Sequence, residues 1–216
     1  MRRYIEHNRV YFNRLTREAE LRETAAPLEL NFKEFMHFRR ENSALHQSFD
    51  LIEMACGIDL PDVVTEDEVF DEMMTTGLDL CCITNVRVLP QVLIKGYTYT
   101  NQHFQDIASF KMEESLNLEE VNTITFFQRS RGMTMQESLD HTGIVFSELI
   151  DKFLSAKQRI RSFGEDTDRM VKLYIEGMED WIAGNIHWSY DCGRYFGNTG
   201  QEVKASGVVK LGLVEF

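Results

Sequence analysis

A serine and a glutamate four positions apart, Ser109 and Glu113, are the side chains of this sequence whose types and spacing best suit metal chemistry. Side chains at positions i and i+4 of an α-helix lie on the same face. A hydroxyl and a carboxylate held together there offer the oxygen ligands that Mg²⁺ prefers. The same two residues are also ordinary neighbours on a solvent-exposed helix, so this pair alone indicates a metal site only weakly.

Motifs along most of the chain carry a family resemblance. The stretch from Asp106 to Glu113 resembles the second metal-binding motif of class I terpene synthases, where an Asn-Asp pair is followed by Ser or Thr and then Glu at four-residue steps. Residues 177–197, GMEDWIAGNIHWSYDCGRYFG, are similar to the last helix of fungal-type sesquiterpene synthases and end in the Arg-Tyr pair of that family. Residues 38–43, FRRENS, and 51–62 match the same family.

This resemblance implies an all-α fold, a helical bundle that holds a cluster of three Mg²⁺ ions around the diphosphate of a prenyl substrate. The bound metal ions and the guanidinium groups of arginine side chains offset the negative charge on the departing diphosphate. Aromatic faces stabilise the remaining carbocation, and a dry cavity keeps water away from it. The predicted function is therefore a Mg-dependent terpene cyclase that ionises a prenyl diphosphate, farnesyl diphosphate above all, and forms a sesquiterpene.

The resemblance also assigns roles at the substrate end of the site. Arg39 matches the diphosphate-sensing arginine, and Arg194 with Tyr195 matches the C-terminal pair that contacts the diphosphate. Trp188 is a candidate aromatic residue facing the carbocation, and plain core packing is the alternative for it.

The metal ligands implied by the resemblance are interrupted in this chain. The asparagine of the family should stand immediately before Asp106, where this chain has Gln105. Residues 86–105, VRVLPQVLIKGYTYTNQHFQ, contain no Asp or Glu and have the propensity of a strand or loop. If they are removed, Asn85 adjoins Asp106 and the motif is intact. We therefore predict Asn85, Ser109 and Glu113 as ligands, with Gln105 as the alternative to Asn85.

The inserted segment has a form that suggests an unspliced intron. Every valine codon begins with GT and glutamine can be encoded by CAG, so a segment running from Val86 to Gln105 can begin with GT and end with AG. Thr100 and Asn101 can be encoded by ACTAAC, which resembles a fungal branch point. The alternative is a genuine insertion specific to this protein.

A second departure concerns the Asp-rich motif of the family, which lies upstream of the matched region. Nothing in residues 1–38 supplies it, and the acidic clusters at 66–68 and 165–168 are typical of helix starts. We therefore predict that residues 1–216 are the C-terminal portion of one terpene synthase domain, incomplete at the N-terminus and inactive alone. The alternative is a non-catalytic helical remnant or partner-binding protein of the same family.

Hydrophobic periodicity predicts the helices that must position these residues. Two sequences, starting at Thr65 and Thr134, have the Ser/Thr-x-x-Glu pattern of a capping box. The second is expected to open the longest helix, which would end at Gly164. The other helices are expected over residues 4–22, 32–40, from 49 to a stop at Gly57, from 65 to beyond 80, and over about 166–190.

Composition excludes several classes of protein. The formal net charge of −12 argues against a nucleic-acid partner. No apolar run is long enough for a membrane span, and the first residues lack the apolar core of a signal peptide. The four cysteines show no CxxC spacing, which is typical of a reduced, cytoplasmic protein. The terpene product and the oligomeric state stay open.

Overall fold

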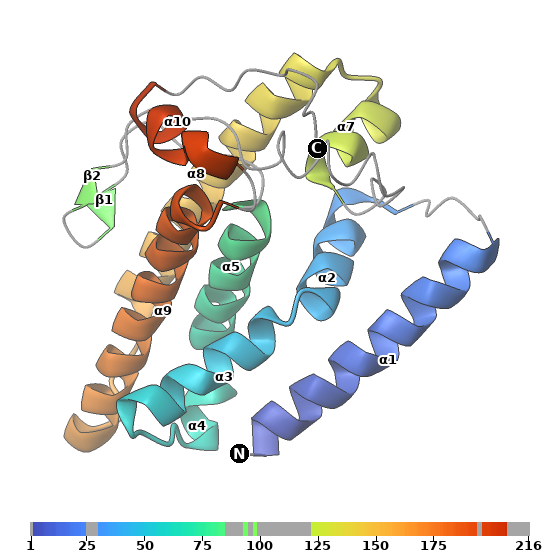
Figure 1. Cartoon of the computed structure of the whole chain (residues 1–216). Coiled ribbons are helices and arrows are strands. Elements are labelled where there is room, and N and C mark those ends of the chain that lie inside the picture. The colour runs from blue at the N-terminus through green and yellow to red at the C-terminus, as the bar shows by residue number, and fades with distance from the viewer. Residues whose placement is uncertain are drawn as a thin grey trace. The chain divides into compact units, whose positions relative to one another are not determined.

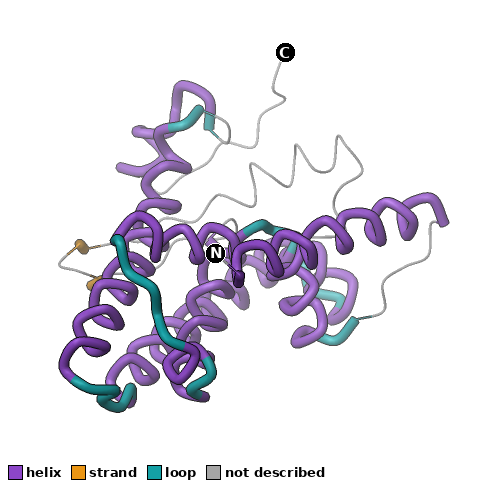
Figure 2. Tube along the Cα trace, turned by 90° about the horizontal axis from the view of Figure 1, so that it is seen from below, coloured by secondary structure: helices purple, strands orange, loops and turns teal. Residues whose placement is uncertain are grey.

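A computed structural model describes residues 2–24, 30–84, 93–94, 97–98, 122–193 and 196–206 of the chain. In these ranges nearly all of the backbone is helical, apart from connections and one small hairpin (Figures 1 and 2). The prediction of an all-α fold is therefore confirmed. No helix in the described ranges is both long enough and apolar enough to cross a membrane.

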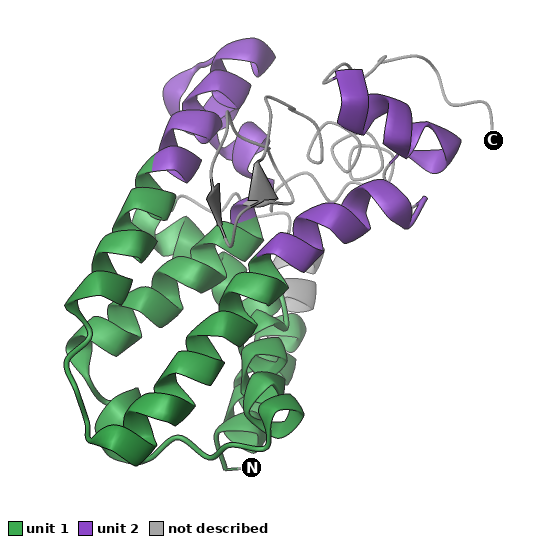
Figure 3. Ribbon diagram, turned by 90° about the vertical axis from the view of Figure 1, so that its left-hand side faces the viewer, with its two compact units in different colours: residues 1–82, 148–182 green, residues 83–147, 183–216 purple. Residues whose placement is uncertain are grey.

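The chain divides into two compact units, which Figure 3 shows in different colours. Unit 1 comprises residues 1–82 and 148–182, and unit 2 comprises residues 83–147 and 183–216. Two long helices, α8 (Met135–Arg159) and α9 (Glu165–Asp191), contribute a part to each unit.

Unit 1 contains a group of helices around an aromatic and aliphatic core. The helix α1 (Arg2–Thr24) lies along α2 (Phe32–Asn42) and α3 (Leu45–Cys56), as Figure 1 shows. A short α4 (Asp62–Thr65) leads into α5 (Glu68–Thr84), which packs with the unit 1 parts of α8 and α9. The largest fully buried side chains of this core are Phe49, Phe70, Phe153, Met73, Leu78, Leu80, Met178 and Ile182.

The start of α5 differs from the prediction. Asp67, and not Thr65, caps this helix, because Asp67 Oδ1 accepts hydrogen bonds from the backbone N–H groups of Val69 (3.1 Å) and Phe70 (3.2 Å). Thr65 ends α4 instead, and its hydroxyl donates to the Asp62 carbonyl. The capping box predicted at Thr65 is therefore wrong. The stop at Gly57 is confirmed, since this glycine has φ +65° and its N–H bonds back to the end of α3.

The capping box at Thr134 is confirmed. The Glu137 carboxylate accepts from the Thr134 N–H at 2.8 Å, and the Thr134 hydroxyl accepts from the Glu137 N–H at 3.3 Å. The expected length of this helix is wrong, because α8 ends at Arg159 and the 27-residue α9 is longer. Residues 160–164 form the connection between the two helices, in which the backbone N–H of Phe163 donates to Asp168 Oδ1 in the first turn of α9 at 2.7 Å.

Two glycines allow the helices of unit 1 to approach closely. A Cβ atom added at Gly177 on α9 would lie 2.4 Å from the Ile52 Cγ2 methyl on α3, and one added at Gly77 would lie 2.7 Å from Met178 Cε. Met178 Cε is the end of a flexible side chain, whereas the Ile52 methyl is fixed close to its backbone. Gly177 is therefore the more demanding contact.

We expect Gly177→Ala to lower the free energy of unfolding by about 1–3 kcal/mol, because the gain in helix propensity is smaller than the cost of overpacking. Gly184→Ala, on the same helix with nothing within 4 Å of the added Cβ, is the matched control and should stabilise the chain by up to about 1 kcal/mol. Urea denaturation followed by circular dichroism measures both. Equal effects of the two substitutions would contradict the packing argument.

Unit 2 contains α7 (Thr123–Arg131), the remaining parts of α8 and α9, a 3₁₀ turn (Gly197–Thr199) and α10 (Gly200–Ser206). The start of α10 packs against the end of α9, where Gly200 is so close to the Tyr190 carbonyl that no side chain fits. The ring of Tyr190 stacks on Phe196 with 5.4 Å between centroids, and Lys204 Nζ lies 3.1 Å from His187 Nδ1.

The described part of the inserted segment is a small antiparallel hairpin. Strand β1 (Leu93–Ile94) pairs with β2 (Tyr97–Thr98), with Leu93 opposite Thr98 and Ile94 opposite Tyr97. The strand propensity predicted for residues 86–105 is confirmed at these four positions. The helix before the insert, α5, is described as far as Thr84, in agreement with the expected helix from 65 to beyond 80.

Candidate active site

Only two of the predicted site residues fall within the described ranges. They are Arg39, in unit 1, and Trp188, in unit 2. The residues predicted to bind metal, together with the C-terminal pair, lie outside the described residues: Asn85, Gln105, Asp106, Ser109, Glu113, Arg194 and Tyr195. The described ranges contain no group of three or more His, Cys, Asp or Glu side chains that could hold a metal ion.

Arg39 lies in the last turn of α2 and reaches the end of α5. Its Nη2 donates a hydrogen bond to the backbone carbonyl of Cys82 at 3.3 Å. The last carbonyls of a helix lack intrahelical partners and carry partial negative charge, and α5 has no basic residue in its own last turn. Arg39 therefore supplies positive charge at the Cys82 carbonyl near the end of α5, and Cys82 lies three positions before Asn85 in the sequence.

One atom of this guanidinium is available for a further ligand. The Nε atom of Arg39 is buried and has no hydrogen-bond partner among the described residues. A buried donor without a partner is costly, and a guanidinium presents its donors in a fork that matches phosphate oxygens. The geometry of Arg39 therefore fits the binding of a diphosphate oxygen.

The next residue, Arg40, contacts α5 one turn earlier. Its Nη1 lies 2.5 Å from Asp79 Oδ1, and the two side chains are only 15% and 13% exposed. Burial raises the pKa of Asp79 above its ordinary value, although the adjacent Arg40 acts in the opposite direction. The sequence reasoning missed this pair, because nothing in the pattern connects two residues 39 positions apart.

The end of α2 also contacts Cys82 through its side chain. The Cys82 thiol lies 3.9 Å from the hydroxyl of Ser43, which directly follows α2. Burial raises the pKa of Cys82 to about 11, so this thiol is unreactive while α2 covers it. The chain then turns through Ala44, whose φ of 58° is the one positive value of a non-glycine residue in the described ranges.

Trp188 lies on the unit 2 part of α9 and is 48% exposed. The next two residues, Ser189 and Tyr190, are buried, so they face the core in this turn of α9 and Trp188 does not. The alternative of plain core packing is thus not supported for Trp188. Its predicted role beside a carbocation stays a prediction.

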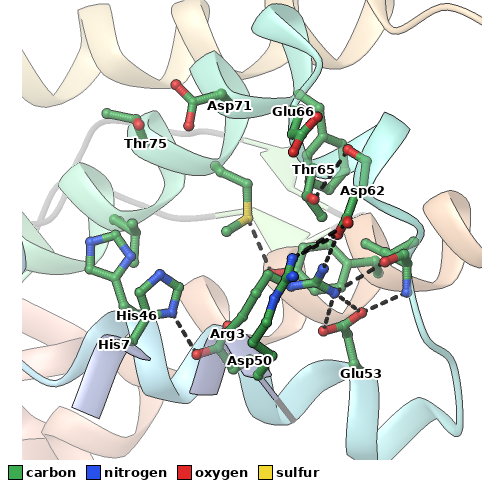
Figure 4. A pocket seen from close by; sticks show the side chains of 16 residues that line it. Arg3, His7, His46, Asp50, Glu53, Asp62, Thr65, Glu66, Asp71 and Thr75 are labelled. Carbon is green, nitrogen blue, oxygen red and sulfur yellow. Dashed lines mark hydrogen bonds and ion pairs between the residues drawn. The ribbon is translucent and has the colours of Figure 1, made fainter. Parts of the chain in front are cut away.

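A separate cavity of about 290 Å³, lined by both charged and apolar side chains, lies within unit 1, and none of the predicted site residues lines it (Figure 4). Arg3 Nη2 binds both carboxylate oxygens of Glu53, at 2.6 and 2.8 Å. His7 Nδ1 lies 2.7 Å from Asp50 Oδ2, and the His7 and His46 rings are 4.8 Å apart. The sequence carried no signal for this cluster.

The His46 ring makes stability depend on pH. Burial, reinforced by the neighbouring His7, lowers the pKa of His46 from 6.5 to about 4. Between these values the unfolded chain binds more protons than the folded chain, so stability falls as the pH falls below about 6.5. We expect a loss of about 2 kcal/mol by pH 5 from this group.

Urea denaturation at pH 7, 6 and 5 tests this expectation. His46→Gln should flatten the pH dependence in this range. An unchanged pH dependence in His46→Gln would show that another group titrates.

Comparison with known proteins identifies the class of protein to which these features belong. The model of the family "Terpene synthase family 2, C-terminal metal binding" matches residues 1–152. Sesquiterpene synthase 6 of Postia placenta is 32% identical over 202 residues, which are 94% of this chain and 52% of that protein. Alpha-muurolene synthase of Coprinopsis cinerea is 34% identical over 181 residues, 84% of this chain and 38% of that protein.

Solved structures show the same fold. The crystal structure of a-eudesmol synthase matches with a TM-score of 0.70 and 21% identity, over 88% of this chain and 56% of that one. Germacradien-4-ol synthase from Streptomyces citricolor matches with a TM-score of 0.65 and 20% identity, over 87% of this chain and 53% of that one. The predicted helical fold of the class I terpene synthases is therefore confirmed.

The chain thus belongs to the terpene synthase family, because the family model matches more than half of its residues. The curated relatives that it matches include fungal sesquiterpene synthases, as the sequence motifs predicted. The chain spans about half the length of these relatives.

Proposed function

We propose that this chain is part of a Mg²⁺-dependent terpene cyclase that ionises a prenyl diphosphate, with farnesyl diphosphate as the substrate, and cyclises the carbocation to a sesquiterpene. Its membership of the terpene synthase family supports the reaction class. Several of its relatives are named as sesquiterpene synthases, which supports a sesquiterpene as the product.

The observation that carries the proposal is the position of Arg39. Its guanidinium lies at the C-terminal end of α5, with one buried donor that has no partner in the described part of the chain. Arg39 would hold the diphosphate by charge-assisted hydrogen bonds, which are stronger than neutral ones. Holding it there orients the carbon–oxygen bond that breaks.

The proposed metal ligands suit Mg²⁺ by their chemistry. Asn85, Ser109 and Glu113 would offer an amide oxygen, a hydroxyl and a carboxylate, which are all hard oxygen donors. Bound Mg²⁺ would supply positive charge to the leaving diphosphate. Gln105 remains the alternative to Asn85, and Arg194 with Tyr195 would contact the diphosphate from the C-terminal side.

We also propose that residues 1–216 form the C-terminal portion of one terpene synthase domain, with 86–105 as an insertion. The family model, which describes a C-terminal metal-binding region, supports this assignment. Trp188, exposed on α9, is the proposed aromatic neighbour of the carbocation.

A non-catalytic, partner-binding protein of the same family is the second candidate. Ile5 and Phe12, seven positions apart on one face of α1, are 63% and 61% exposed. Large exposed apolar residues on one face of a helix are typical of surfaces that bind another protein. This candidate requires no binding of diphosphate.

Binding of inorganic diphosphate separates the two candidates. With Mg²⁺ present, isothermal titration calorimetry should show binding by the unsubstituted chain, and Arg39→Gln should weaken it about tenfold or more, because a charged hydrogen bond to phosphate is lost. Arg9→Gln is the matched control, since Arg9 is exposed on α1 and pairs with Glu6. Absence of Mg²⁺-dependent binding would favour the non-catalytic candidate.

A further inference from the structure

Two consecutive arginines of α2 contact the last two turns of α5. Arg40 reaches the carboxylate of Asp79, and Arg39 reaches the carbonyl of Cys82, one helical turn further along. Neighbouring residues on a helix point about 100° apart, so both contacts form together only over a narrow range of rotations and translations of α2 along α5. The pair of contacts therefore defines the register between the two helices.

The presence of the buried Arg40–Asp79 pair is better explained by a role in fixing the register of α2 on α5 than by a contribution to folding stability. Its charges are largely removed from water, and burial outweighs the attraction of Arg40 in its effect on the pKa of Asp79. Such desolvation offsets much of the gain from a buried ion pair, so a buried pair is weak evidence for stability. Fixing the register of packed helices is the best-attested use of buried polar contacts.

We propose that Arg40 and Asp79 are positioning residues of the diphosphate site, which hold α2 in the register on α5 that places the Arg39 guanidinium at the end of α5. The inference rests on the proposed function for its consequence, but the register itself is a property of the fold. Neither Arg40 nor Asp79 contacts the diphosphate in this scheme.

Cys82 provides a reporter of this register that does not depend on any ligand. Its thiol is buried where α5 meets the end of α2, beside Ser43. If α2 loses its register, the thiol becomes accessible and its reaction with iodoacetamide accelerates. Mass spectrometry of the labelled peptides separates Cys82 from its neighbour Cys81 and from the exposed Cys56, which serves as the internal standard.

In the unsubstituted chain Cys82 should react far more slowly than Cys56. Arg40→Gln and the milder Asp79→Asn should each accelerate labelling of Cys82 by about tenfold or more, because local opening exposes the thiol. Arg40→Lys, which keeps a charge opposite Asp79, should retain most of the protection. The matched control is Glu179→Gln, which breaks the partly buried Lys157–Glu179 pair of α8 and α9 (2.5 Å) and should leave Cys82 protected.

The diphosphate titration then tests the functional consequence. Arg40→Gln and Asp79→Asn should weaken Mg²⁺-dependent binding of inorganic diphosphate by about tenfold, whereas Glu179→Gln should leave it unchanged. Loss of affinity in Arg40→Gln but not in Asp79→Asn would overturn the inference, because it would mean that Arg40 binds the ligand directly. Unchanged labelling of Cys82 in both variants would also overturn it.

Failure of the proposed function has a different signature. If Arg39→Gln binds inorganic diphosphate as tightly as the unsubstituted chain, the assignment of the diphosphate site is wrong, whatever the labelling of Cys82 shows. If Arg39→Gln binds weakly while Asp79→Asn binds normally, the site is right and the positioning role is wrong.

Discussion

Deletion of residues 86–105 is expected to increase the affinity of the chain for inorganic diphosphate in the presence of Mg²⁺ by about tenfold or more. The deletion joins Asn85 to Asp106, so that Asn85, Ser109 and Glu113 follow one another at four-residue steps. At that spacing their side chains share one helix face. In the undeleted chain Gln105 takes the first of these positions, and its side chain is one methylene longer. Octahedral Mg²⁺ tolerates little displacement of a ligand oxygen.

Two variants make this prediction specific. Asn85→Ala in the deleted chain should remove the gain in affinity, because the gain is attributed to that side chain. Gln105→Asn in the undeleted chain supplies the shorter amide without removing the insert. If Gln105→Asn restores as much affinity as the deletion, the insert itself does no harm. A deletion that leaves the affinity unchanged would refute the assignment of Asn85.

The sequence of the mature messenger RNA shows whether residues 86–105 come from an unspliced intron. Reverse transcription across this junction should yield a mature product that lacks the codons for 86–105. If the mature message retains them, and a longer protein carrying them is active, the intron hypothesis is wrong and Gln105 takes the ligand role.

The longer helices could be predicted from the sequence because each is amphipathic. The short helices α7 and α10 were not predicted, and not every helix boundary could be, as the start of α5 illustrates. Thr65 has the spacing of a capping box, but Asp67 also precedes the apolar face and can cap the helix. Arg161, 94 positions away, binds Asp67 Oδ2 at 2.7 Å and holds that carboxylate at the start of α5. A local pattern cannot contain such a long-range contact.

The same limit applies to the site. The resemblance indicated Arg39, but its partner is a backbone carbonyl of α5, and a carbonyl has no signature in a sequence. Spacing along α9 was also an incomplete guide to burial, because large apolar residues recur there at helical steps of three and four positions. Tyr174 and Met178 are buried, whereas Trp181 and Trp188 are 40% and 48% exposed at the same helical spacing. Periodicity identifies one face of a helix, but only tertiary packing decides which part of that face is covered.

Incubation of the 216-residue chain with farnesyl diphosphate and Mg²⁺ is expected to give no cyclic product above background. Ionisation places negative charge on the departing diphosphate, and catalysis depends on positive groups arranged to receive it. Residues 1–38 contain no Asp-rich motif, so the chain would supply only one of the two ligand sets of the proposed three-metal cluster. Loss of a single group that stabilises such charge lowers a rate about 10²–10³-fold, and a whole ligand set contributes more.

Gas chromatography of the headspace measures the product, and a hybrid protein provides the matched positive control. In the hybrid, the part of sesquiterpene synthase 6 of Postia placenta that this chain does not match is joined to this chain without residues 86–105. Product from the hybrid, its loss in Arg39→Gln, and background from the 216-residue chain together would support the proposed site. A clear cyclic product from the 216-residue chain alone would contradict the argument, because ionisation would then proceed without the Asp-rich ligands.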